Sequence, residues 1–71
     1  MNDSNDLDVS EFMEPGDYDG EGLEFDDACE EAWKKAKRDG HQSPKWCKVK
    51  HHWVKMENPV SEHKVIIKPG G

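Results

Sequence analysis

The chain has 71 residues, about a third of them hydrophobic, and a formal net charge of −6. A chain this short forms one small domain whose core barely offsets the conformational entropy of ordering it, so we expect oligomerisation or a partner to contribute. No apolar run approaches the roughly 20 residues that span a bilayer, and the acidic N-terminus lacks the basic and apolar regions of a signal peptide. Cys29 and Cys47 lack the spacing of a disulfide scaffold, so we predict reduced thiols and a cytoplasmic protein.

Charge is divided along the chain. The first 31 residues hold 13 acidic side chains and neither Lys nor Arg, whereas the remaining 40 hold ten bases and three acids. The formal charges of the two parts are therefore −13 and +7. Such a field steers association and selects partners. Because no catalytic or cofactor motif accompanies it, the sequence indicates an interaction protein and not an enzyme.

Residues 1–22 are polar, acidic and interrupted by breakers such as Pro15-Gly16. A segment of this composition cannot bury enough apolar surface to order itself, so we predict a flexible acidic arm. Its few apolar side chains, Phe12 among them, leave open a short turn over residues 9–13 that settles on the body or on a partner.

Apolar side chains then recur at i, i+3, i+4, i+7, i+8 and i+11, which predicts an amphipathic helix over residues 24–39. The stripe consists of Phe25, Ala28, Cys29, Ala32, Trp33 and Ala36. Acidic residues in the first turn and basic residues near the end match the helix macrodipole, and Gly40 suits the position after the C-cap. We expect the stripe to be buried, Trp33 included.

Two segments of alternating polarity, residues 45–56 and 62–68, predict an antiparallel β-hairpin. Its inner face is expected to carry Cys47, Val49, His51, Trp53, His63, Val65 and Ile67. A four-residue loop would align the apolar face of one strand with the basic face of the other, so we expect a three- or five-residue loop or a β-bulge. The helix packed on this hairpin gives an α+β domain over residues 23–71. Its open edge strand favours a homodimer.

Four histidines and two cysteines raise the question of a metal site. On a strand, however, Cys47 and His51 stand roughly 13 Å apart at ~3.3 Å per residue, too far to share a zinc ion. His51 and His52 point to opposite faces. Both cysteines lie on apolar faces, where thiols are usually unreactive. We therefore predict no catalytic residue, no metal site and no cofactor.

The outer face of the hairpin is basic. It is expected to carry Lys45, Lys48, Lys50, Lys55, Lys64 and Lys68, together with His52 and an exposed Trp46. Bases interleaved with an aromatic ring can bind nucleic acid, although lysines on a sheet also prevent aggregation at its edge. Because the acidic arm would repel phosphate, this alternative function requires the arm to act as a removable autoinhibitor.

The acidic residues are the leading candidates for partner binding, and the predicted set is Asp17, Asp19, Glu21, Glu24, Asp26, Asp27, Glu30 and Glu31. The five on the helix span about 10 Å at ~1.5 Å rise per residue, or roughly one carboxylate per 2 Å. Duplex DNA has one phosphate charge per ~1.7 Å of axis. A lysine- and arginine-lined groove for DNA would meet a similar field here, so we predict a DNA mimic that excludes DNA by competition. A solubilising acidic tail is the other interpretation.

The acid-rich run DLDVSEFMEPGDYDGEGLEFDDACEE, the small size and the α+β body resemble the small acidic DNA-mimic proteins that lytic phages make to disable host nucleic-acid-binding proteins. This resemblance implies a host-takeover protein that binds a basic DNA-binding protein such as the nucleoid-associated protein HU. It further implies a location in the host cytoplasm or nucleoid.

A second resemblance covers residues 25–68. The segments FDDACEEAWKKAK, KWCKV and SEHKVIIK are similar to the helix and last two strands of dodecins, which are small flavin-binding oligomers. The resemblance implies the helix-on-hairpin arrangement and, as a further alternative function, a small oligomeric ligand carrier. The leading strand of dodecins is not apparent in the sequence, where the acidic arm takes its place.

Overall fold

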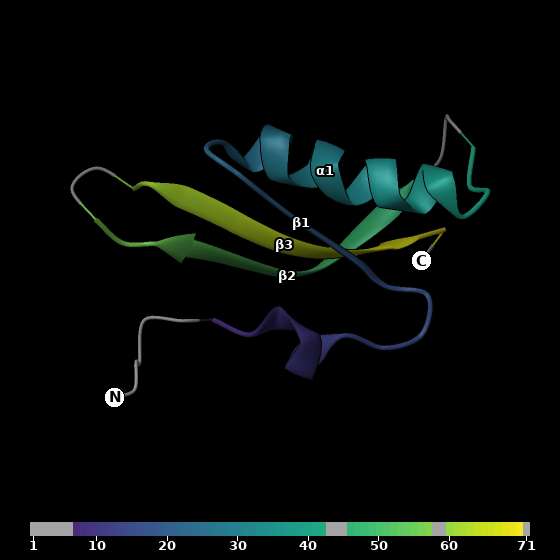
Figure 1. Ribbon diagram of the computed structural model, residues 1–71, viewed down its shortest axis with the longest axis horizontal. Helices are drawn as coiled ribbons and strands as arrows, with labels where there is room; N and C mark the ends of the chain where they lie inside the picture. Colours follow the sequence, from purple (N-terminus) through teal and green to yellow (C-terminus); the bar gives the residue numbers. More distant parts are fainter. Residues whose placement is uncertain (1–6, 43–45, 58–59, 71) are drawn as a thin grey trace.

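The computed structural model describes residues 7–42, 46–57 and 60–70. Within these residues the elements are a 3-10 helix, η1 (Val9–Phe12), followed by β1 (Tyr18–Gly22), α1 (Phe25–Arg38), β2 (Cys47–Lys55) and β3 (Glu62–Pro69). The strands form one antiparallel sheet in the order β1-β3-β2. Helix α1 lies on one face of this sheet and η1 on the other (Figure 1). The α+β class, the helix and the hairpin are therefore confirmed, and a third strand is added.

Helix α1 has the bounds that its charge and apolar periodicity predict. Glu24 is its N-cap and Asp39 its C-cap. Gly40 follows the C-cap, adopts φ +106° and donates its backbone N–H to the Lys37 carbonyl at 3.0 Å. This left-handed conformation favours glycine and pairs a carbonyl group that the helix end leaves without a partner. The buried side chains of α1 are Ala28, Ala32 and Ala36.

The helix packs directly on the backbone of β1. A Cβ atom added at Gly20 would overlap the carbonyl oxygen of Ala28 and lie 2.5 Å from the backbone nitrogen of Ala32. Gly22 is nearly as close to the helix, since its Cβ would lie 2.6 Å from that of Asp27. Alanines on one side and glycines on the other thus bring the two backbones together.

Strand β1 corrects the prediction of a flexible arm over residues 1–22 and of a domain that begins at residue 23. Residues 18–22 pair with β3, from Tyr18 opposite Ile67 to Gly22 opposite His63. The preceding residues 7–17, here called the strap, cross the far face of the sheet, and residues 1–6 lie outside the described part of the chain. A short turn at η1 agrees with the option left open above. Strand β1 is thus a leading strand before α1 that was not apparent in the sequence.

A β-bulge sets the register of the hairpin, and it is one of the alternatives that the sequence predicted. Val49 lies opposite Ile67, but His51 lies opposite Ile66, so the pairing shifts by one residue between them. Beyond the bulge, Trp53 and His52 exchange the faces that strict alternation assigns to them. The prediction that Trp53 packs against the helix is therefore wrong, and its ring instead contacts Phe12 of the strap.

The two faces of β3 are buried under different layers. Ala28, Ala32, Val65 and Ile67 form the core beneath α1, against which Cys29 and Cys47 pack. Ile66 points the other way and is also fully buried. The helix covers β1 and β3, whereas on β2 the side chains of Val49 and Val54 remain 40% exposed. Trp46 is 91% exposed, which confirms the prediction for this residue.

Replacing Gly20 with alanine is expected to lower the free energy of unfolding by about 3 kcal/mol or more, because the added methyl group meets backbone atoms that cannot rotate away. Urea unfolding followed by tryptophan fluorescence measures this loss. Glu21→Ala is the control, since Glu21 is exposed on the same strand and is expected to change stability little. Equal stability of the two variants would contradict close backbone packing at Gly20.

Candidate partner-binding surface

The structure separates the eight predicted partner-binding residues into two groups. Asp17 is buried and Asp19 pairs with Lys35 of α1 at 3.1 Å, so both serve contacts within the fold. The other six remain on the surface: Glu21, Glu24, Asp26, Asp27, Glu30 and Glu31. Five of these six belong to α1 or its N-cap, because the alanine stripe faces the sheet and leaves the acidic positions facing solvent.

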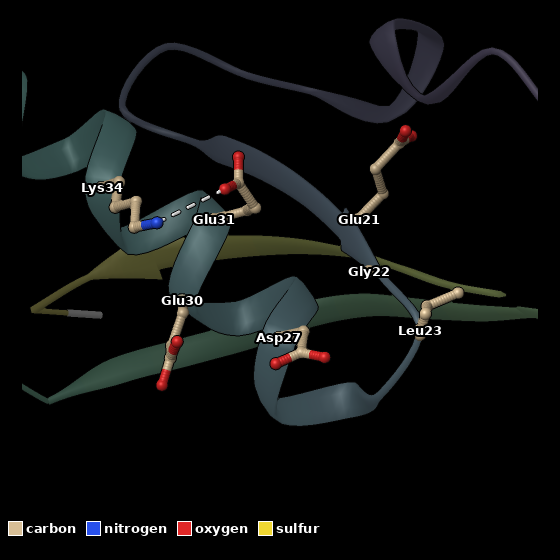
Figure 2. A pocket seen from close by; sticks show the side chains of 7 residues that line it. All are labelled: Glu21, Gly22, Leu23, Asp27, Glu30, Glu31 and Lys34. Carbon is tan, nitrogen blue, oxygen red and sulfur yellow. Dashed lines mark ion pairs between the residues drawn. The ribbon is translucent and has the colours of Figure 1, made fainter.

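Four of the exposed carboxylates line a groove between the end of β1 and the first half of α1 (Figure 2). This acidic groove consists of Glu21, Gly22, Leu23, Asp27, Glu30, Glu31 and Lys34. Leu23 lies at its rim with 75% of its surface exposed. The groove therefore combines several negative charges with one apolar contact, which suits a lysine or arginine side chain with its apolar stem and charged head.

Among the described residues, the carboxylates of the groove form only weak ion pairs. Glu31 lies 3.6 Å from Lys34, and Glu21 lies 3.7 Å from Lys64, with all four side chains at least partly exposed. Exposed pairs of this kind contribute little and exchange readily. Within the described part of the chain, neither Asp27 nor Glu30 forms an ion pair. Most of the charge of the groove is therefore available to a partner.

On the opposite face of the sheet, the strap is fastened to β2. The Lys50 ammonium donates to Asp17 at 2.8 Å and to Glu14 at 3.1 Å, and the Glu14 backbone N–H donates to Asp17 at 2.9 Å. The ring of Phe12 lies over His51 and Trp53, with centroid distances of 5.5 and 5.3 Å. The acidic segment thus covers part of the basic hairpin face, and the sequence did not identify Lys50 as the residue that holds it.

The contacts of Asp17 with Lys50 and with the Glu14 backbone determine its protonation state. Burial by itself would raise the pKa of Asp17, but the hydrogen bonds from Lys50 and from the Glu14 N–H, with the charges of Lys50 and Lys68, hold it below its usual range. The same hydrogen bonds to Asp17 and Glu14 raise the pKa of Lys50. Both groups are therefore ionised at neutral pH. Oδ1 of Asp17 is buried and accepts no hydrogen bond from the described residues.

The histidines and cysteines are distributed over both faces of the sheet. His51 lies under the strap, whereas His52 lies on the helix side beside Phe25. Burial, followed by the charges of Asp26 and Cys47, raises the pKa of Cys29 and keeps it a thiol at neutral pH. No group of three or more His, Cys, Asp or Glu side chains among the described residues is arranged to hold a metal ion.

Asp17→Asn is expected to lower the free energy of unfolding at neutral pH by about 1–3 kcal/mol, because Lys50 loses the buried one of its two carboxylate partners. The depressed pKa of Asp17 stabilises the fold above its ordinary value of 3.8 and ceases to do so as the pH falls through the folded-state value. The difference between wild type and variant should therefore narrow below about pH 4. Urea unfolding at a series of pH values measures it, with exposed Glu57→Gln as control. If the stability difference between wild type and Asp17→Asn stayed constant at acidic pH, the ion pair between Asp17 and Lys50 would not be its cause.

Comparison with protein-family models, with curated proteins and with solved structures finds no match to this chain. In the part of the chain that the structure describes, no helix is long and apolar enough to cross a membrane. What the acidic surface binds must therefore be inferred from its own charge and geometry.

Proposed function

We propose that this protein binds the cationic surface of a nucleic-acid-binding protein, such as HU, and excludes the nucleic acid by mimicking its charge. The observation that carries the proposal is the exposed acidic face of α1, formed by Glu24, Asp26, Asp27, Glu30 and Glu31. These carboxylates project from a helix that is packed against β1, so their spacing is fixed before binding. A preorganised surface loses less conformational entropy on association than a disordered tail does.

The spacing of these charges supports mimicry over general solubility. Five carboxylates along about 10 Å of helix axis, at ~1.5 Å rise per residue, approach the linear charge density of a duplex. DNA has one phosphate charge per ~1.7 Å of axis, and basic proteins bind it largely by neutralising those charges. Glu21 of β1 adds a further carboxylate across the acidic groove. A lysine- or arginine-lined surface would meet a comparable row of anions.

Neutralising three groove carboxylates together, in the variant Asp27→Asn/Glu30→Gln/Glu31→Gln, is expected to weaken inhibition of DNA binding by about tenfold or more. Each exposed charge pair contributes up to about 1 kcal/mol, so three lost pairs have this effect. The measurement is displacement of fluorescent duplex DNA from purified HU. Wild-type inhibition should itself weaken steeply between ~50 and ~200 mM salt.

The matched control is Glu11→Gln/Glu57→Gln/Glu62→Gln, which changes the net charge equally but lies outside the groove. Inhibition by the control should stay near wild type. If the two triple variants lost inhibition equally, net charge alone would explain the effect and the position of the carboxylates would not matter. If the wild-type protein displaced no DNA at low salt, the proposal would be rejected.

The strap supports a second candidate, a nucleic-acid-binding module whose basic sheet face is covered by its own acidic segment. Glu14 and Asp17 neutralise Lys50, and the ring of Phe12 packs at a tilt against His51 and Trp53. Phe12 would have to move before a base could stack on the part of Trp53 that it covers. On this reading, release of the strap would create a binding site.

Phe12→Ala/Glu14→Gln separates the two candidates while leaving β1 intact. For the second candidate, the variant should bind single-stranded DNA or RNA in a salt-sensitive manner that wild type does not show, as fluorescence anisotropy measures. For DNA mimicry, the variant should bind neither and should still displace DNA from HU, since the face of α1 is unchanged. Deleting residues 1–22 would not make this distinction, because it removes β1.

A further inference from the structure

Two histidines from neighbouring strands meet on the helix side of the hairpin. Nε2 of His52 lies 3.0 Å from Nδ1 of His63, and the two rings are close to parallel, with an interplanar angle of 22°. The register explains the contact, because His52 lies opposite Val65 and His63 lies opposite Val54. The two histidines are therefore diagonal neighbours on one face of the sheet, brought there by the bulge.

The contact between these nitrogens is a hydrogen bond when one ring donates its proton to the other. A bound metal ion would take the place of that shared proton, since each neutral imidazole has one unprotonated nitrogen that can act as a ligand. Both side chains retain exposed surface, His52 more than His63. In the hydrogen-bonded arrangement the two nitrogens point at each other, because the 5.3 Å between the ring centroids is close to the 3.0 Å contact plus the two centroid-to-nitrogen distances. A bound ion would require both rings to turn until their lone pairs meet beside that line.

The ligand type favours particular metal ions. Imidazole nitrogens suit copper, nickel, iron and zinc. Cu(II) also forms the stronger complexes with nitrogen ligands in the divalent series.

The surroundings of the pair favour a stable position for His52. The ring of Phe25, the first residue of α1, lies 4.5 Å from the His52 ring between centroids. This contact limits the orientations of the imidazole on one side and leaves the other side to solvent. Because the described residues add no third His, Cys, Asp or Glu ligand, water would complete the coordination. Binding should then be reversible and open to an external ligand.

We propose that His52 and His63 form a two-histidine chelate for a divalent transition-metal ion, Cu(II) above Ni(II). The chelate joins β2 to β3 and is separate from the acidic face of α1. Its existence does not depend on the function proposed above. A metal held by both strands binds the folded chain only, and it therefore stabilises the hairpin.

The test uses the untagged full-length protein and Ni(II) as the first probe, because Ni(II) does not oxidise thiols as Cu(II) does. Isothermal titration calorimetry should give one Ni(II) per chain for wild type. His52→Ala and His63→Ala should each weaken binding at least tenfold, and His51→Gln, one residue along β2 on the opposite face, should change it less than twofold. Thermal unfolding should shift upward with Ni(II) in wild type and His51→Gln but not in His63→Ala.

Cu(II) is then added to the variant Cys29→Ala/Cys47→Ala, and electron paramagnetic resonance should show a tetragonal signal with two nitrogen donors that His63→Ala removes. Absence of Ni(II) binding to wild type would overturn the proposal. So would affinities of His52→Ala and His63→Ala that equal the wild-type value, or a Cu(II) signal that persists without His63. DNA displacement from HU by His63→Ala should remain at the wild-type level, so failure of one proposal can be told from failure of the other.

Discussion

The close approach of α1 to β1 is the contact on which the rest of the structure depends. Gly20 allows the helix backbone to reach van der Waals contact with the strand, and Ala28 and Ala32 provide an equally small surface from the other side. Among the described residues, Ile66 and Val65 are the largest side chains that are fully buried. Stability in a core this thin depends on tight packing, because voids cost dispersion contacts that nothing else replaces. The helix is thereby fixed in one position, and its outward face acquires a fixed geometry.

The division of charge along the sequence is partly cancelled within the folded chain. Glu14 and Asp17 neutralise Lys50, Asp19 pairs with Lys35, and Glu21 lies near Lys64. These pairs join the strap and β1 to the basic elements that follow them. Among the described residues, the acidic residues in the first half of α1 have one such pair, between Glu31 and Lys34. The acidic face of α1 is thus a part of this 31-residue stretch whose charge the fold leaves exposed.

The sequence was sufficient to predict the elements that have a periodic apolar signal. Helix α1 and both hairpin strands carry such a signal, and their bounds agree closely with the structure. Strand β1 carries none, because the positions that it buries against the helix are Gly20 and Gly22, which contribute no hydrophobic side chain. The bulge before His51 depends on which of several registers packs best, and a one-residue shift exchanges the faces of all residues beyond it.

The same reasons explain which parts of the candidate sites were predictable. The exposed acidic residues of α1 follow from helix periodicity, and Glu21 was also among the predicted residues. The position of Glu21, Gly22 and Leu23 across a groove from α1 requires strand β1, which was not predicted. The contact between Asp17 and Lys50 joins residues far apart in sequence, and the pairing of His63 with His52 instead of His51 requires the bulge. Gly20 connects these observations, because strand β1 carries the strap to one face of the sheet and holds α1 on the other. The helix sets the spacing of the carboxylates on α1, and its packing on β1 holds the helix in one position. The proposed mimicry of a polyanion depends on that rigidity more than on the number of acidic residues.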